Sequence, residues 1–351
     1  MLKEADIIYR LLAGKPIFAG YNVTNRCTMR CAFCSVPSLP HEDMDLAAAR
    51  HAFDILKGIG VPVIGITGGE PFLRKDLAEL IYSVQERGML CTVVTNGDLF
   101  DRTRAAELAG VRNIVHFALS MDTLDASVYK SLRGKSTLPA TLARYLDAIE
   151  HGPSCPYKLN VVLGPENVDE VDDILLFAST AGLYVSFIPI NIAPGGLHRG
   201  RTYDTLTPEA RQRLAAAFLR LHRLKTGGAP LWDHRGFYLL AADYIAGRKL
   251  PDCRAGQLFL DLRSDGKLAF CNEMEHFVDL TRVESLSLGQ LRRSREAWAP
   301  RIDACRTASA CCYTCSYNVV ATAANLPAYV FDFLRLKLSL PGQKAGARAR
   351  P

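Results

Sequence analysis

A regular alternation of short apolar segments and helical segments is the feature of this chain that most restricts its fold. Between residues 16 and 191, six apolar segments typical of strands alternate with segments of helical periodicity. Successive β-then-α units place their strands parallel, with the helices outside the sheet. We therefore predict an α/β fold, either an open doubly wound sheet or a partial barrel, with functional residues at the carboxyl ends of the strands. The predicted strands are Ile17–Val23, Val61–Thr67, Leu90–Thr95, Asn113–Ser120, Lys158–Leu163 and Tyr184–Asn191, and the predicted helices are Leu46–Ile59, Asp76–Arg87, Asp101–Leu108, Leu138–His151 and Val168–Ala181.

The chain changes character after the sixth predicted strand. Residues 192–200 form a loop by composition, and a helix is predicted from Pro208 to about Leu224 with Thr207 as its N-cap. Further on, six cysteines lie between Cys253 and Cys315, which indicates a second, smaller domain organised by metal. The predicted divisions are an N-terminal helix (1–15), the strand-and-helix domain (16–230), the cysteine-rich domain (231–330) and a basic tail (331–351).

The cysteine content sets this chain apart, because it has 11 cysteines and no sign of export. Charged residues interrupt the apolar residues of the first 15 positions, so no signal peptide is predicted, and no run of about 20 apolar residues predicts a transmembrane helix. We therefore expect a cytoplasmic protein, where many cysteines indicate metal binding or catalysis rather than disulfides. Cys91, inside a predicted strand, and Cys155 are expected to be buried or incidental.

The net charge of +6 is concentrated in the tail. Five basic residues and no acidic residue follow Asp332, which leaves +1 for the rest of the chain. The body therefore has no large basic field, and no nucleic-acid partner is expected. Residues Leu334–Leu340 alternate apolar and polar side chains, which fits a solvated tail, a strand, or weak contact with an anionic membrane surface.

Three cysteines follow the first predicted strand closely. Cys27, Cys31 and Cys34 are spaced C-x₃-C-x₂-C in the loop at its carboxyl end. Structural zinc usually takes four protein ligands in paired C-x₂-C hooks, whereas three thiolates suit an iron–sulfur cubane whose fourth iron stays open to a ligand that is not protein. Zinc with His41 as a fourth ligand remains an alternative on spacing alone.

Small polar residues follow the next three strands. The second strand ends at Gly68-Gly69-Glu70-Pro71, the third at Asn96-Gly97 and the fourth at Ser120-Met121-Asp122. Glycines allow close approach of backbone to a ligand, and a carboxylate accepts from an ammonium group. Each segment alone is compatible with an ordinary turn, but in series they predict a polar ligand across the top of the sheet.

The cysteine motif with an aromatic residue before its last cysteine, followed by Gly68–Pro71, resembles the radical S-adenosylmethionine (radical SAM) superfamily over roughly residues 16–191. This resemblance implies a partial (β/α)₆ barrel, like an incomplete TIM barrel, that holds a [4Fe–4S] cluster. The open iron of the cluster would bind S-adenosylmethionine, whose reductive cleavage yields a deoxyadenosyl radical that takes hydrogen from substrate. By motif position, the cluster ligands and catalytic residues would be Cys27, Cys31 and Cys34, and the S-adenosylmethionine contacts Gly68, Gly69, Glu70 and Pro71 at the amino group, Ser120 and Asp122 near the ribose, Phe33 near adenine, and Asn96.

The second cysteine group begins with a predicted hairpin. Two alternating segments flank Ser264–Lys267, so Cys253 and Cys271 should come together, and a C-x₂-C hook follows at Cys312 and Cys315. Geometry alone fits zinc and an iron–sulfur cluster equally. The pattern C-x₁₂-G-x₄-C followed by C-x₂-C is similar to the auxiliary-cluster extension called SPASM, or twitch in its one-cluster form. That resemblance implies one auxiliary [4Fe–4S] cluster, with Cys305 and Cys311 spare or replacing Cys312 as a ligand.

Three substrate classes fit a radical SAM enzyme with this layout. The first is a small metabolite, such as a sugar, a nucleoside or a natural-product intermediate, that undergoes oxidation, decarboxylation or epimerisation. The second is a peptide that is crosslinked, and the third is a lipid. An electron donor such as flavodoxin or ferredoxin is expected as a partner. Residues 198–203 and Trp232–Arg235 are candidate substrate-binding loops, although both also fit ordinary surface loops.

Overall fold

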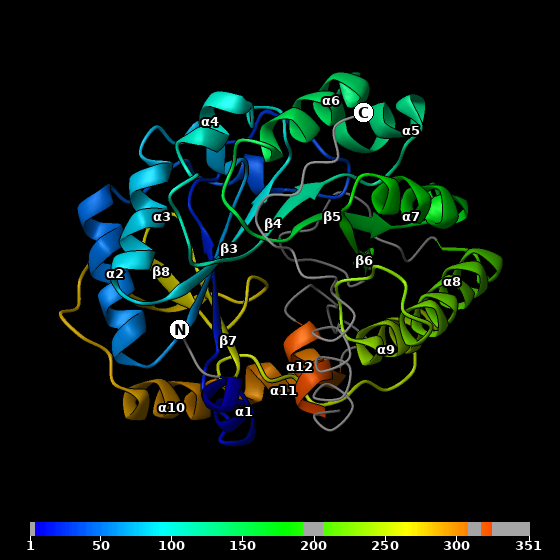
Figure 1. Cartoon of the computed structure of the whole chain (residues 1–351). Coiled ribbons are helices and arrows are strands. Elements are labelled where there is room, and N and C mark those ends of the chain that lie inside the picture. Colours follow the sequence, from blue (N-terminus) through cyan, green and yellow to red (C-terminus); the bar gives the residue numbers. More distant parts are fainter. Residues whose placement is uncertain (1–3, 192–205, 308–316, 325–351) are drawn as a thin grey trace.

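The protein is a partial (β/α)₆ barrel extended at one edge by three further strands (Figure 1). This computed structural model describes residues 4–191, 206–307 and 317–324. The sheet order β6-β5-β4-β3-β2-β1-β7-β8-β9 runs sequentially from β1 to β6, whereas a doubly wound sheet reverses at a switch point. All five pairings from β1 to β6 are parallel, and the helices lie outside them, which decides for the barrel. The six strands are β1 (Phe18–Asn22), β2 (Val63–Thr67), β3 (Leu90–Thr95), β4 (Ile114–Ser120), β5 (Tyr157–Leu163) and β6 (Tyr184–Pro189).

The helices between the strands follow the predicted pattern, with one addition. All five predicted helical segments are present, and α8 (Pro208–Thr226) begins after the predicted cap, since the Thr207 hydroxyl accepts from the backbone N–H of Ala210. The sequence analysis missed α5 (Ala126–Arg133), which Asp125 caps and Gly134 ends in the left-handed conformation. The remaining helices here are α1 (Glu4–Leu12), α2 (Leu46–Gly58), α3 (Leu77–Glu86), α4 (Arg102–Ala106), α6 (Leu138–Ile149), α7 (Val171–Thr180) and α9 (Arg235–Ile245), with short 3₁₀ turns η1 (Val36–Ser38), η2 (Pro71–Leu73) and η3 (Val168–Glu170).

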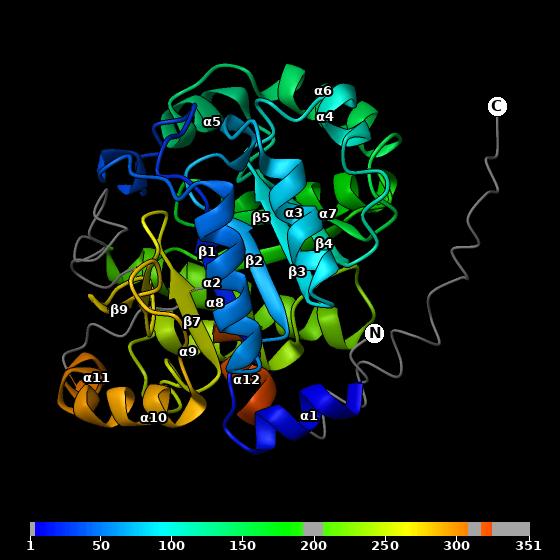
Figure 2. The same ribbon diagram turned by 90° about the vertical axis from the view of Figure 1, so that its left-hand side faces the viewer.

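The cysteine-rich region continues the barrel sheet. β7 (Phe259–Leu262) pairs with β1 in parallel, and Figure 2 shows β7, β1 and β2 side by side. β7 then pairs antiparallel with β8 (Lys267–Ala269), which confirms the predicted hairpin, and β8 with β9 (His276–Asp279). The sequence does not reveal the pairing of β7 with β1, because the partners are more than 200 residues apart. Helices α10 (Leu288–Ala297), α11 (Ala299–Thr307) and α12 (Tyr317–Ala324) complete the described region.

The interior of the barrel is more polar than the branched aliphatic layers that usually fill a closed barrel. The cavity inside it is lined by Gly20 of β1, Gly65 of β2, His116 of β4, Lys158 of β5 and Asp261 of β7, among others. Gly20 and the polar side chains at these positions leave space, so the barrel contains a cavity. None of the helices in the described ranges is long and apolar enough to cross a bilayer. The predicted loop 192–200, the candidate loop 198–203 and the basic tail lie outside the described residues.

Candidate active site

The cysteine loop lies between β1 and η1 and is fastened to the end of α5. The backbone N–H of Ala32 donates to the carbonyl of Leu132 at 2.9 Å. Two of the sulfurs receive hydrogen bonds from elsewhere in the loop and the barrel. Cys27 Sγ accepts from the backbone N–H of Met29 at 3.4 Å and from the Asn96 side-chain amide at 3.6 Å. Arg133 Nη1 lies 3.9 Å from Cys31 Sγ, so the loop supplies the N–H donors that stabilise sulfur ligands.

The three thiols fit a cluster better than a single metal ion. Burial raises the pKa of each thiol, that of Cys34 to about 11, so a metal must offset the cost of ionising them. In the described residues, no three His, Cys, Asp or Glu side chains are gathered closely enough to hold one metal ion. A cubane takes one thiolate per iron and so spreads its ligands. His41, the ligand of the zinc alternative, is exposed, with Nε2 3.2 Å from the carbonyl of Pro37.

The two glycines after β2 let this loop lie directly against the cysteine loop. A Cβ on Gly68, whose φ is +128°, would lie 2.4 Å from the carbonyl oxygen of Thr24, and one on Gly69 would lie 2.1 Å from that of Arg26. The backbone N–H groups of Gly69 and Glu70 donate to those same two carbonyls, at 2.7 and 2.8 Å. The glycines are therefore required first for packing of the two loops, and Gly68 also faces the cavity.

The Glu70 side chain joins the ends of β2 and β3. It is fully buried, and Oε1 accepts from the hydroxyl of Thr95 at 2.8 Å and from the backbone N–H of Phe72 at 3.1 Å. Oε2 accepts from the backbone N–H of Asn96 at 2.7 Å. Burial nevertheless raises the pKa of Glu70 to about 7. Pro71 begins η2 directly after this carboxylate and is buried with it.

Asp122, at the end of β4, forms a buried ion pair that the sequence analysis missed. Its Oδ2 accepts from Arg133 Nε at 2.6 Å, and its Oδ1 accepts from the backbone N–H of Val162 at 2.8 Å. The Arg133 guanidinium also lies 5.5 Å from the centre of the Phe33 ring. Arg133 therefore links the cysteine loop to β4, and helix α5, which carries it, is the signal that sequence analysis overlooked. Ser120 is half-buried at the end of β4.

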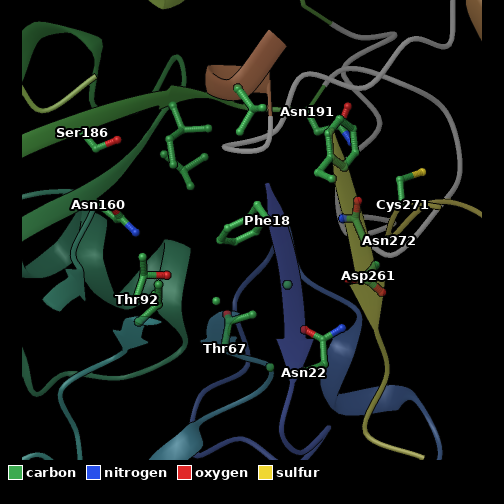
Figure 3. Close-up of a pocket in the computed structure, with 18 of the residues that line it drawn as sticks. Phe18, Asn22, Thr67, Thr92, Asn160, Ser186, Asn191, Asp261, Cys271 and Asn272 are labelled. Atoms are coloured by element: carbon green, nitrogen blue, oxygen red, sulfur yellow. The ribbon is translucent and has the colours of Figure 1, made fainter. Parts of the chain in front are cut away.

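One cavity of about 470 Å³ occupies the barrel and reaches the cysteine loop (Figure 3). Phe33, Cys34 and Gly68 line it where the cysteine loop approaches. Figure 3 shows Thr92 and Asn160 on one side of this space, and Asp261, Asn272 and Cys271 on the other. The volume falls within the range of about 300–1,000 Å³ typical of small-molecule sites. Glu70, Pro71, Asn96, Ser120 and Asp122 are not part of its described lining.

A cluster of aromatic and titratable side chains forms one end of the cavity. The ammonium of Lys158 lies 5.5 Å from the Trp232 ring, and the His116 ring packs edge-on against the same tryptophan at 4.9 Å. Burial holds the pKa of His116 well below its usual value, so this imidazole is neutral. Asp233 accepts from the hydroxyls of Ser186 at 2.6 Å and Tyr238 at 3.2 Å. Trp232 and Asp233 thus lie in the cavity, whereas the β-strand residues His116 and Lys158 were not predicted.

Two of the four predicted auxiliary ligands lie in the described residues. Cys271 is buried in the cavity wall, and Cys253 is close enough that its thiolate would help to raise the pKa of Cys271, after burial as the main cause. The two thiols are thus near enough to interact electrostatically. Cys311, Cys312 and Cys315 lie outside the described residues, as does the side chain of Cys305. Cys91 is fully buried in β3, as predicted.

A family model described as the radical SAM superfamily matches residues 21–178, which contain the cysteine loop and the strands around it. This part of the chain is a radical SAM domain. Enzymes of this superfamily use a [4Fe–4S] cluster and S-adenosylmethionine, and the three cysteines of the loop are suited to such a cluster.

Two curated relatives and one solved structure show the range of similar proteins. The GTP 3',8-cyclase of Ectopseudomonas mendocina is 29% identical over 79% of this chain and 85% of its own length. The PqqA peptide cyclase of Xanthomonas euvesicatoria pv. vesicatoria is 26% identical over 82% of this chain and 77% of its own. The structure of anSMEcpe with bound AdoMet and the Cp18Cys peptide, a radical SAM enzyme of the SPASM/twitch type, superposes with a TM-score of 0.59 at 15% identity, covering 80% of this chain and 82% of that one. These relatives act on different substrate classes by name, so the family leaves the substrate open.

Proposed function

We propose that this radical SAM enzyme abstracts hydrogen from a small metabolite held in the barrel cavity. The observation that carries the proposal is that Cys34 and Gly68 face the same cavity of about 470 Å³ as the polar side chains of β3, β5 and β7. Cofactor and substrate would thus share one space, in which the protein orients the reacting groups.

The chain's own residues hold and orient the reactants. Cys27, Cys31 and Cys34 would hold the cluster, and the N–H donors on Cys27 and Cys31 would stabilise its sulfurs. When bound, the cluster supplies one electron that splits S-adenosylmethionine into methionine and the deoxyadenosyl radical. Because the oxygens of Glu70 already accept three hydrogen bonds, we assign it to positioning the loop. Contact with the cofactor then falls first to Gly68 and Phe33, which line the cavity, whereas Gly69, Pro71, Asn96, Ser120 and Asp122 are not in its described lining.

An auxiliary [4Fe–4S] cluster would complete the site. Cys271 lines the cavity and Cys253 is near enough to influence its pKa, and Cys312 and Cys315 are the proposed remaining ligands. A cluster held by these cysteines would supply an electron acceptor for the site, which would make the net reaction an oxidation. The iron content of the anaerobically reconstituted protein tests this proposal. Two cubanes would give about eight irons per chain, whereas one cubane would give about four.

Anaerobic reconstitution tests the activity itself. The full chain with iron, sulfide, S-adenosylmethionine and dithionite should form deoxyadenosine and methionine in equal amounts. Cys155→Ala, a cysteine substitution outside both clusters, should form the same products. If the wild-type protein binds iron and sulfide but yields neither product, the proposed function is wrong.

A peptide substrate is the second candidate, favoured by the likeness to PqqA peptide cyclase over most of the chain. The two candidates differ in what must enter the barrel. A peptide-dependent enzyme should form deoxyadenosine faster with its precursor peptide than with any compound that the cavity can enclose. Faster turnover with a small polar compound would exclude this candidate.

A further inference from the structure

The carboxylate of Asp261 lies in the wall of the barrel cavity with one oxygen unsatisfied. Asp261 is in β7, between β1 and β8, where Gly20 and Ala269 are its neighbours across the sheet. The side chain is more than nine-tenths buried. In the described part of the chain, Oδ2 is buried and has no hydrogen-bond partner. A buried carboxylate oxygen without a hydrogen-bond donor destabilises the fold, so a ligand that donates a hydrogen bond to it would remove this cost.

The strand beside Asp261 leaves room for such a ligand. Gly20 has no left-handed backbone conformation, so it does not need to be glycine for its φ angle. Glycine inside a strand costs stability, and one reason to keep it is close approach by a ligand. A Cβ on Gly20 would lie 3.6 Å from Asp261 Oδ1, which is ordinary contact. The missing side chain at position 20 therefore opens space next to the carboxylate.

The opposite side of the cavity offers further hydrogen-bonding groups. The Oδ1 atom of Asn160 is buried and has no partner in the described residues, and the same holds for Nδ1 of the neutral His116. Asn160 and Asp261 lie on facing sides of the space in Figure 3. Three unsatisfied polar atoms on three different strands thus border one cavity. This arrangement suits a ligand with several hydroxyl or amino groups, which fix its orientation.

The charges of the cavity restrict the ligand further. Its described lining contains no arginine, one lysine, Lys158, and two carboxylates, Asp233 and Asp261. A nucleoside triphosphate brings about four negative charges, which proteins usually meet with arginine, lysine or a metal ion. The described lining does not contain a comparable group of positively charged side chains. A neutral or cationic ligand matches these charges, although GTP is the substrate in the name of one relative.

We propose that Asp261 is the anchor of a substrate subsite, where its carboxylate accepts a hydrogen bond from a hydroxyl or ammonium group of a small substrate that carries no phosphate chain. This proposal rests on the proposed function and names the substrate class of that same cavity. Gly20 shapes the subsite, and Asn160 binds the far side of the same ligand.

The first test needs no substrate. Asp261→Asn removes a buried charge that has no partner, so the variant protein without ligand should melt a few degrees higher than wild type at pH 8. Asp233→Asn is the matched control, because the carboxylate of Asp233 has two hydroxyl donors and its loss should lower the melting temperature. A structural role for Asp261 predicts the opposite sign, and a lower melting temperature of Asp261→Asn would overturn the proposal.

The second test measures binding to the full chain loaded with iron, sulfide and S-adenosylmethionine. Calorimetric titrations use glucosamine, glucose and GTP as probes. We expect a sugar to bind and GTP not to, and Asp261→Asn to weaken sugar binding about tenfold or more. Preference for glucosamine over glucose identifies an ammonium at Asp261, and equal binding identifies a hydroxyl. Tighter binding of GTP, binding of neither sugar, or unchanged sugar affinity in Asp261→Asn would overturn the subsite.

Gly20→Ala separates this subsite from the cofactor site. Its methyl group fits beside Oδ1 without a clash, so folding and S-adenosylmethionine affinity should be unchanged while sugar binding is lost. Weaker S-adenosylmethionine binding in either variant would place the cofactor, not the substrate, at Asp261. Deoxyadenosine formation with dithionite is measured in parallel, because its absence in wild type refutes the proposed function while the sugar titrations still decide the role of Asp261.

Discussion

Two regions of the barrel differ in whether their buried polar side chains have hydrogen-bond partners. At the rim, which we define as residues 27–34, 68–71, 95–96 and 120–122, the carboxylates are fully partnered. Glu70 accepts three hydrogen bonds, and Asp122 is paired with Arg133. On the wall, which we define as Asn160 and Asp261, each side chain has an oxygen without a partner in the described residues. The carboxylates of the rim are therefore satisfied without a ligand, and the two oxygens of the wall are not.

This difference distinguishes the rim, which holds the cluster and cofactor in place, from the wall, which selects the substrate. A cluster and its cofactor need a fixed loop, which the rim provides by joining the ends of β1 to β4 through side chains. A substrate site must exchange its occupant, so it presents groups that only the ligand satisfies. Substitutions on the rim should therefore reduce stability or cluster content, whereas substitutions on the wall should leave both intact or improve stability.

The largest expected effect concerns the cysteines of the rim. Cys34→Ala removes one of three cluster ligands, so deoxyadenosine formation should fall to background and iron content should drop by up to about four atoms per chain. Iron analysis and product chromatography measure the two quantities. Cys155→Ala is the matched control and should change neither. If the Cys34→Ala protein kept its full iron content and activity, the cluster would not be bound at the rim.

The next effect tests the completeness of the rim. Asp122→Ala leaves the Arg133 guanidinium buried and without its carboxylate, which should lower the free energy of unfolding by about 3–5 kcal/mol. Urea denaturation of the protein without cofactor measures this change. Asp147→Ala, which breaks the exposed ion pair with Arg102, should have little effect. Equal effects of the two substitutions would mean that the rim is no more tightly built than the surface.

The rim and the wall also show which features of the site could be predicted from the sequence alone. The predicted strands end within two residues of the observed ones because each is a short apolar run, and the positions of Cys27, Glu70 and Asp122 at strand ends follow from them. The pairing of Asp122 with Arg133 could not be predicted without α5, whose sequence has few apolar residues to mark it. The position of Asp261 in the cavity could not be predicted either, for a different reason. Its place in the cavity depends on β7 pairing with β1, a contact between distant parts of the chain.

A smaller effect on the wall depends on pH. Burial raises the pKa of Asp261 to about 7, above the value near 4 of an unfolded aspartate. The folded protein therefore holds this proton more tightly, so ionisation costs stability that is absent below about pH 4 and grows until about pH 7. Asp261→Asn removes this cost, and its advantage over wild type in urea denaturation should be a few kcal/mol at pH 8 and smaller at pH 5. An advantage that is equal at both pH values, or larger at pH 5, would show that the carboxylate has a partner.

The smallest expected effect is the absence of change in His41→Ala, and it decides between cluster and zinc at the rim. His41 is exposed, and its one described hydrogen-bonding contact is with the carbonyl of Pro37. A surface substitution of this kind changes stability by less than about 0.5 kcal/mol. If the three rim thiols bind a cubane, iron content and deoxyadenosine formation should match wild type, because no protein ligand besides the cysteines is needed. If they bind zinc with His41 as fourth ligand, the same variant should lose one zinc per chain on metal analysis. An exposed side chain can be removed without disturbing the fold, so any metal lost in His41→Ala would have been held by that imidazole.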